Sequence, residues 1–417
     1  MKTLKISHIE RTLLLLMCIS IFIFNYQATG NGNVITNILI LAFIFLEIIL
    51  VIGKCKVLKN YEIFSFVLFL VCCFISCIYS FNESDSLIKV KTILILVLLL
   101  FALVEFLKKD EKNFNFLLKT LAFSGSIASL YLIINADWKS GVRIDNIIGD
   151  SNQVGAYIAY SFTVLLFLVK TKNVNKVLGI SGLVVMFIAN MLSGSRSALI
   201  VTVLSLIVFW FISIKPDKKM VLKIIFSLIL GVILLYLLYY FIMNNEVLYN
   251  IIGKRYVSFF EIISGEQSSI NETSTQTRSM LIDLAWNKFI YSPFTILFGN
   301  GIGYFASYWE SIGGRYAFCH NNYLELLSGV GIIGTIFFYF TYVKTLLICI
   351  KKIKKDRDLK SIMCMIILMQ MLIMHWFVVF YYQKCEFLFI SIFVYFNYHI
   401  LKKKKTEKID DIGMKYN

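Results

Sequence analysis

Long apolar runs recur along the chain and are separated by mostly short polar connections. A bilayer core of about 30 Å is crossed by about 20 mostly apolar residues in a helix. Strands that cross a membrane would instead alternate polar and apolar residues in short segments. The pattern therefore predicts an all-α polytopic membrane protein with about twelve transmembrane helices. The predicted spans lie near residues 12–26, 34–53, 61–80, 90–107, 114–134, 153–169, 174–192, 197–214, 220–243, 321–343, 361–380 and 386–401.

Composition excludes the soluble and disordered classes of protein. Hydrophobic residues make up 59% of the 417 residues and charged residues 16%, whereas an ordinary soluble domain has roughly 45–50% apolar and about 25% charged residues. A water-soluble fold could not bury so much apolar surface, and a disordered chain would carry far less of it.

The excess of positive charge reports the orientation of the loops. The net charge is +16, and with the amino terminus placed in the cytoplasm, 30 of the 41 Lys and Arg residues fall on cytoplasmic segments. Cytoplasmic loops of membrane proteins are enriched in these cations. We therefore predict that both termini are cytoplasmic, and the alternative in which the charge binds nucleic acid fails.

Arginine is distributed differently from lysine. Of the 30 inner cations only Arg11 and Arg357 are arginines, whereas five of the 11 outer cations are. Arginine presents a planar fork that binds phosphate or carboxylate through two hydrogen bonds. The outer arginines are therefore candidates for anion binding. The alternative for each of them is an ion pair with an outer carboxylate such as Asp145, Glu261 or Asp283.

Two outer connections are longer and more polar than the rest. Asn135–Ser151 contains Arg143 and leads to Asn152 at a helix start, and Asn244–Cys319 has 76 residues, too many for a plain connector. The predicted organisation is transmembrane helices 1–9 in residues 1–243, an extracytoplasmic loop with interfacial helices in 244–319, helices 10–12 in 320–401 and a basic cytoplasmic tail in 402–417.

The long loop contains two segments with helical periodicity. The stronger has one stripe made of Arg278, Leu281, Ile282, Ala285, Trp286 and Phe289. It predicts a helix on the membrane surface that carries Arg278 in its first turn and is ended by Pro293. The other is Ser258–Ile263, and GNGIGYF (Gly299–Phe305) is expected to form a turn. The alternative role for Arg278 is to reach lipid headgroups.

Two polar positions at the outer boundary are candidates for chemistry. His320 stands beside Asn321 and Asn322, and Glu325 shares a helix face with Asn321. A neutral imidazole is a natural proton acceptor near pH 7, although a boundary histidine alone is more often structural. Arg196 lies in the tight turn SGSRS, where a charged residue at the membrane boundary indicates a ligand site. His375, within a predicted span, has no comparable polar neighbours in the sequence.

The order of these motifs resembles that of the O-antigen ligase and O-antigen polymerase superfamily of bacterial polysaccharide assembly. The likeness covers the whole topology and is sharpest between Arg143 and Gly334. One departure is Gly329, where many members have a glutamate, which leaves open whether Glu325 or no carboxylate supports His320. The matching motifs are the SGSRS turn, KRY (Lys254–Tyr256), TQTR before a Trp-containing helix, SPF, GNGIGYF and HNNYLELLSGVGIIG (His320–Gly334).

The resemblance implies a GT-C-like glycosyltransferase of twelve helices in the bacterial cytoplasmic membrane, independent of metals and without a cofactor. Its functional positions would be Arg196, Arg255, Arg278 and His320. We expect the arginines, with Arg143, to hold the diphosphate of an undecaprenyl-linked oligosaccharide on the extracytoplasmic face. His320 would accept the proton of the acceptor hydroxyl, and the remaining substrate-binding candidates are Asn152, Asn321, Asn322 and Glu325.

Partners and alternatives follow from the same resemblance. The expected partners are lipid-linked donor and acceptor, membrane lipids, a chain-length regulator and a flippase. Polymerisation of repeat units into O-antigen or capsular polysaccharide is favoured because GNGIGYF and HNNYLE look closer to polymerases, and ligation to the lipid A core is the alternative. A transporter or lipid flippase is the rival from another class, but such proteins usually have broken helices and repeated halves. Cys319 and Cys385 could meet on the oxidising side, although a bridge is not expected.

Overall fold

The computed structural model describes residues 2–24, 31–51, 60–136, 150–213, 220–254, 257 and 273–413, and every regular element in them is helical. One long helix stands at each of the twelve predicted spans, so the all-helical prediction is confirmed for this part of the chain. The elements are α1 (Lys2–Phe24), α2 (Asn31–Val51), α3 (Tyr61–Ser76), η2 (Cys77–Tyr79), α4 (Glu83–Lys109), α5 (Glu111–Asn135), α7 (Ser151–Lys170), α8 (Lys176–Leu192), α9 (Arg196–Ser213), α10 (Met220–Asn244), α11 (Glu246–Leu248), the π-helix η3 (Tyr249–Gly253), α13 (Thr273–Phe289), α14 (Pro293–Phe298), α15 (Tyr304–Ser311), α16 (Asn322–Asp356), α17 (Leu359–His375) and α18 (Lys384–Gly413).

Seven of the described helices are long and apolar enough to cross a bilayer: α1, α2, α3 with η2, α4, α5, α7 and α16. The helices α8, α9, α17 and part of α10 are apolar but shorter. The polytopic membrane class therefore holds, and the count of twelve crossings stays a prediction.

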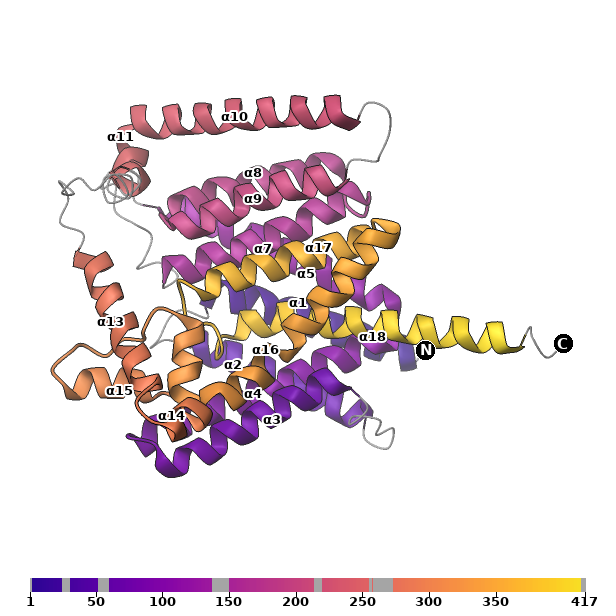
Figure 1. The fold of residues 1–417 in the computed structure, drawn as a ribbon. Helices are drawn as coiled ribbons and strands as arrows, with labels where there is room; N and C mark the ends of the chain where they lie inside the picture. Colours follow the sequence, from indigo (N-terminus) through magenta and orange to yellow (C-terminus); the bar gives the residue numbers. More distant parts are fainter. Residues whose placement is uncertain are drawn as a thin grey trace.

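The long helices run side by side, and the short ones gather at one end of the bundle (Figure 1). α11, α13, α14 and α15 lie at that end, whereas α1 begins and α18 ends at the opposite end. This arrangement separates the termini from the long loop, as the charge pattern requires. Which end faces the cytoplasm stays a prediction.

Four sequence-based boundaries were wrong. α16 continues to Asp356, because a helix satisfies its own backbone and can extend beyond the apolar run that the bilayer needs. α17 already ends at His375. Arg278 is the sixth residue of α13 and not in its first turn. Pro293 begins α14, where Ser292 and Thr295 form a capping box. Proline suits the first position of a helix because an N–H at that position would make no hydrogen bond within the helix. The predicted helix at Ser258–Ile263 lies outside the described residues.

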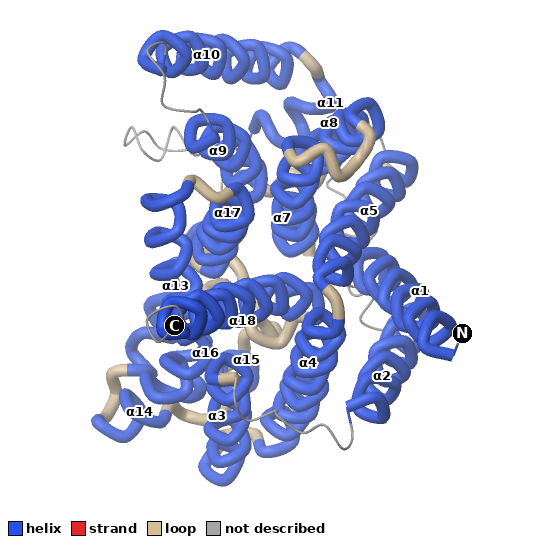
Figure 2. The backbone as a smooth tube through the Cα atoms, turned by 90° about the vertical axis from the view of Figure 1, so that its right-hand side faces the viewer, coloured by secondary structure: helices blue, strands red, loops and turns tan. Residues whose placement is uncertain are grey.

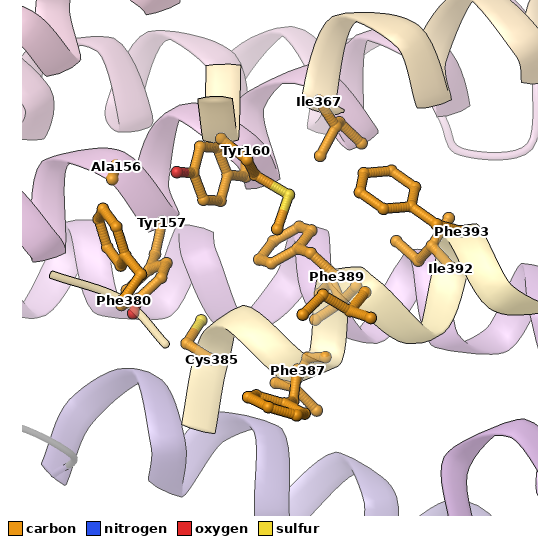
Figure 3. Packing of buried hydrophobic residues seen from close by; sticks show 14 of the residues in the cluster. Ala156, Tyr157, Tyr160, Ile367, Phe380, Cys385, Phe387, Phe389, Ile392 and Phe393 are labelled. Atoms are coloured by element: carbon orange, nitrogen blue, oxygen red, sulfur yellow. The ribbon is translucent and has the colours of Figure 1, made fainter. Parts of the chain in front are cut away.

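α7 is the most enclosed of the spanning helices. Of its most apolar stretch, 83% of the residues are buried inside the protein. Its Tyr157 ring packs edge-on against Phe380 at 5.7 Å, and Tyr160 packs against Phe389 of α18 at 5.2 Å (Figure 3). Aromatic pairs at these separations add to the packing energy of their buried area. α7 is thus the central helix of the bundle. Its first residues lie at the end that carries α13–α15.

The glycine-rich turn is confirmed and packs directly on α16. Asn300 N–H donates to Ser328 O, and Gly301 N–H donates to Gly329 O, both at 2.8 Å. α16 is kinked at Gly331, which has φ 66° and ψ −171°. A Cβ atom at Gly331 would lie 2.3 Å from the carbonyl oxygen of Leu297 in α14. The two glycine motifs of the sequence therefore meet, and glycine is required at Gly331 both for its backbone conformation and for close approach.

Replacing Gly331 with alanine should lower the thermal unfolding midpoint of the detergent-purified protein by several degrees, because the new Cβ cannot fit without moving α14. Gly231→Ala is the matched control, since a Cβ there meets no atom within 4 Å in α10. The control should unfold at or slightly above the wild-type temperature. Equal midpoints for the two variants would contradict this packing.

Candidate functional site

His320 lies in the bend that immediately precedes α16. Its backbone has φ 56°, a left-handed conformation that costs a non-glycine residue about 1–2 kcal/mol. Asn321 caps α16 by accepting from Leu324 N–H at 3.0 Å, and Glu325 Oε2 accepts from Cys319 N–H at 3.1 Å. These bonds fix the backbone on both sides of the histidine. Glu325 therefore supports the backbone of the turn that carries His320, and its support of the imidazole itself stays a prediction.

The electrostatic surroundings of His320 keep its ring neutral. Burial lowers the pKa of His320 below its ordinary value of 6.5, the charge of Arg278 lowers it further and the charge of Asp150 opposes the shift. An imidazole that remains unprotonated near neutral pH can accept a proton. The structure thus brings together His320 and Arg278, which the sequence had separated by 42 positions.

α13 carries Arg278 to this place by packing its apolar stripe on the start of α16. Leu281 and Ala285 are buried in a small cluster with Phe305 of α15 and with Cys319. Because Arg278 precedes Leu281 by one helical turn, its side chain leaves α13 on the side of the cluster. The predicted stripe is confirmed for Leu281, Ala285 and Phe289, whereas Trp286 is 48% exposed.

The first turn of α7 connects His320 to the SGSRS turn. Asp150, whose charge acts on His320, caps α7 by accepting from Asn152 N–H at 2.8 Å. One turn further, a Cβ at Gly155 would lie 2.7 Å from Ala198 Cβ and 3.1 Å from Ser193 Oγ. This close approach holds the turn before α9, which begins at Arg196. Asn152 and Arg196 are both half-buried at this end of the bundle.

A buried polar network extends from the site into the bundle. Asn322 Oδ1 accepts from the N–H groups of Phe380 and Tyr381 at 2.7 and 3.0 Å, and Asn322 Nδ2 donates to Tyr339 Oη at 2.9 Å. Tyr339 Oη lies 3.0 Å from His375 Nδ1. The network thus joins the first residue of α16 to the end of α17 and to the turn that follows it.

His375 has no polar neighbours in the sequence, but the fold brings polar partners to it from other helices. His375 Nε2 lies 2.7 Å from Glu386 Oε1, which also accepts from Tyr342 Oη at 2.8 Å. His375 and Glu386 are both 0% exposed. No local pattern indicates these contacts, because the partners lie 11 and more residues away on other helices.

Asn321, Asn322 and Glu325 are at most 2% exposed and have internal partners. Their contacts support positioning of the site, and a direct role in substrate binding stays a prediction. Arg143 and Arg255 lie outside the described residues, so their placement is untested. Among the described residues no three His, Cys, Asp or Glu side chains form a group that could hold a metal, and independence of metals stays a prediction.

Cys319 and Cys385 are both buried, and both are free thiols. Burial raises the pKa of the Cys319 thiol well above its ordinary value, as does the nearby Glu325 charge. The thiol is therefore protonated, and Sγ donates to Asn321 O at 3.1 Å. Its role is to pack and brace the turn before His320.

Replacing Glu386 with alanine should lower the free energy of unfolding by about 3–5 kcal/mol, because it leaves His375 and Tyr342 with unpaired buried groups. Glu386→Gln keeps an acceptor and should lose less. Glu111→Ala is the control: Glu111 also lies 2.6 Å from a histidine, His399, but its side chain is 78% exposed, and an exposed pair contributes little. Denaturant unfolding in mild detergent measures all three, and a loss for Glu111→Ala as large as for Glu386→Ala would contradict the assignment.

Comparison with known proteins gives one family match. Residues 181–339 match the family described as O-antigen ligase (Wzy_C), a segment that runs from within α8 to within α16 and contains Arg196, Arg278 and His320. No curated protein matches the chain. Over these residues the match supports the resemblance to the O-antigen ligase and polymerase superfamily that the motifs indicated.

Proposed function

We propose, from the membership of residues 181–339 in the O-antigen ligase family, that this integral membrane protein is a glycosyltransferase that uses a lipid-diphosphate-linked glycan as donor. The observation that carries the proposal is the pairing of a half-buried histidine of lowered pKa with a nearby arginine, His320 with Arg278. Glycosyl transfer needs both a base for the acceptor hydroxyl and positive charge for the departing diphosphate.

In the proposed reaction His320 accepts the proton of the acceptor hydroxyl while the oxygen bonds to the anomeric carbon. The bond between that carbon and the diphosphate oxygen breaks, and the electron pair leaves with the lipid diphosphate. Arg278, with Arg196 from the neighbouring turn and Arg255 and Arg143, would stabilise the charge that develops there. The lost proton leaves His320 before the next cycle.

Arg278 serves the base as well as the leaving group. Its positive charge lowers the pKa of His320, so the imidazole stays neutral and ready to accept a proton. A carboxylate in the same place would raise that pKa and protonate the base. The same guanidinium thus favours both halves of the transfer, which is the reason to place it at the centre of the mechanism.

We propose the polymerase activity, in which the acceptor is a second lipid-linked repeat unit and the product is O-antigen or capsular polysaccharide. Ligation of the glycan to the lipid A core is the second candidate, and it is favoured by the description of the matched family. Both reactions use the same donor and the same two charged groups, so the acceptor alone distinguishes them.

The pH dependence should move in opposite directions in two charge variants. The base works unprotonated, so the rate should fall as pH drops through a His320 pKa below 6.5. Arg278→Gln removes a charge that lowers this pKa and should move the acid limb to higher pH, besides slowing turnover. Asp150→Asn removes a charge that raises it and should move the limb to lower pH, while asparagine still caps α7. Profiles of kcat/KM against pH measure both, and shifts of the same sign would refute the assignment.

Purified protein given only lipid-linked repeat units should yield a ladder of lengthening glycans on a gel. His320→Ala should lower the rate by about 10²–10⁴-fold with little change in donor binding, because general-base catalysis typically contributes that much. Products that appear only after core oligosaccharide is added would establish the ligase activity instead. A His320→Ala protein as fast as wild type would remove the catalytic assignment under either activity.

A further inference from the structure

An apolar groove lies between α5 and α8, at the end of the bundle away from His320. Its cavity volume is about 510 Å³, and α7 forms its floor with Leu165 and Leu168. Figure 2 shows α5 and α8 beside α7, and the three helices pack against one another. The rim includes Phe123, Leu130 and Leu178, which are 46–70% exposed. The groove therefore opens toward the surrounding lipid.

The groove is longer than one leaflet but does not cross the whole bilayer core. Along α5 its lining runs from Phe116 to Leu130, fourteen helical steps or about 21 Å, whereas the whole core is about 30 Å thick. The hydroxyls of Ser126 and Ser181, which also line it, donate to carbonyl groups of their own helices. These hydroxyls are therefore already bonded within their own helices. The groove surface needs no polar partner there, which suits a hydrocarbon chain.

Glycine residues of α8 allow the helices that line the groove to pack closely. A Cβ at Gly179 would lie 2.3 Å from Val169 Cγ2, and one at Gly182 would lie 2.9 Å from Leu165 Cδ2. These glycines line the groove and allow α8 to approach α7 closely. The same two positions contribute no side chain that would fill the groove.

Positive charge is concentrated at one end of the groove. Lys119 lines it, and Lys170, Lys172 and Lys176 are exposed in the turn between α7 and α8, next to the lining residues Val174 and Leu178. Among the described residues no carboxylate forms an ion pair with these four lysines. Basic pockets between helices at the membrane surface bind anionic lipid headgroups.

We infer that this groove binds one anionic phospholipid, with an acyl chain along α7 and the phosphate at Lys119 and the α7–α8 turn. A partner helix would need a groove across both leaflets, so a single lipid fits better. In a bilayer the apolar groove alone gives no preference over the surrounding lipid, so the lysines supply the selectivity. The site is independent of the proposed transferase activity.

The test measures phospholipid that remains bound after the detergent-solubilised protein is exposed to phosphatidylglycerol or phosphatidylcholine and washed, by mass spectrometry of the released lipid. Wild type should retain about one phosphatidylglycerol per chain and much less phosphatidylcholine. Lys119→Gln with Lys172→Gln and Lys176→Gln should lower phosphatidylglycerol retention about tenfold. The matched control changes three exposed lysines of the same end, Lys351, Lys354 and Lys355, to glutamine and should retain the lipid.

A second pair of variants tests the groove itself. Ser181→Phe fills it and should displace the lipid, whereas Val184→Phe, on the same helix but outside the lining, should not. Equal retention of the two phospholipids by wild type, or equal retention by the two lysine triples, would overturn the headgroup assignment. Equal retention by the two phenylalanine variants would overturn the groove as the binding site.

Discussion

The pairing of buried polar groups at the start of α16 is the constraint on which the rest of the site depends. In an apolar interior an unpaired amide or carboxylate is costly, so each such group must find a partner in a fixed direction. Asn321, Asn322 and Glu325 all do so, and they bind three different parts of the chain: their own helix, the turn after α17, and the backbone before His320. These bonds fix the backbone on both sides of His320, whose own backbone is left-handed.

Charge then determines what the positioned imidazole can do. The charge of Arg278 acts on His320 because Leu281 and Ala285 of α13 are buried against Phe305 and Cys319. Apolar packing of α13 therefore affects the pKa of the histidine. Asp150, which caps α7, acts on the same ring with the opposite sign. Burial and Arg278 lower the pKa of His320, and the positive charge of Arg278 also suits the anion that the proposed reaction releases. Packing, pKa and proposed catalysis are therefore linked through a few contacts.

The two ends of the bundle differ in the kind of cation they use. The end with α13–α15 has Arg278 and Arg196, which suit a diphosphate that must be held in one geometry. The opposite end has lysines at Lys119, Lys172 and Lys176, whose compact and flexible charges suit a mobile headgroup. α7 spans the distance between them, with Asp150 at one end and Lys170 at the other. One central helix thus relates the proposed catalytic site to the proposed lipid site.

The sequence by itself determined the helical membrane class, the positions of twelve long helices and the resemblance to the O-antigen ligase family, because apolar runs and short motifs are local properties of the chain. It also identified His320 and Arg278 as candidates for one site, through the resemblance to the family. Only the tertiary structure decided that these two act on each other, that Glu325 braces a turn, and that His375 has a buried acid partner in Glu386. Each of those facts joins residues on different helices, and the distance between helices is set by packing and by satisfied polar groups, which no local pattern records.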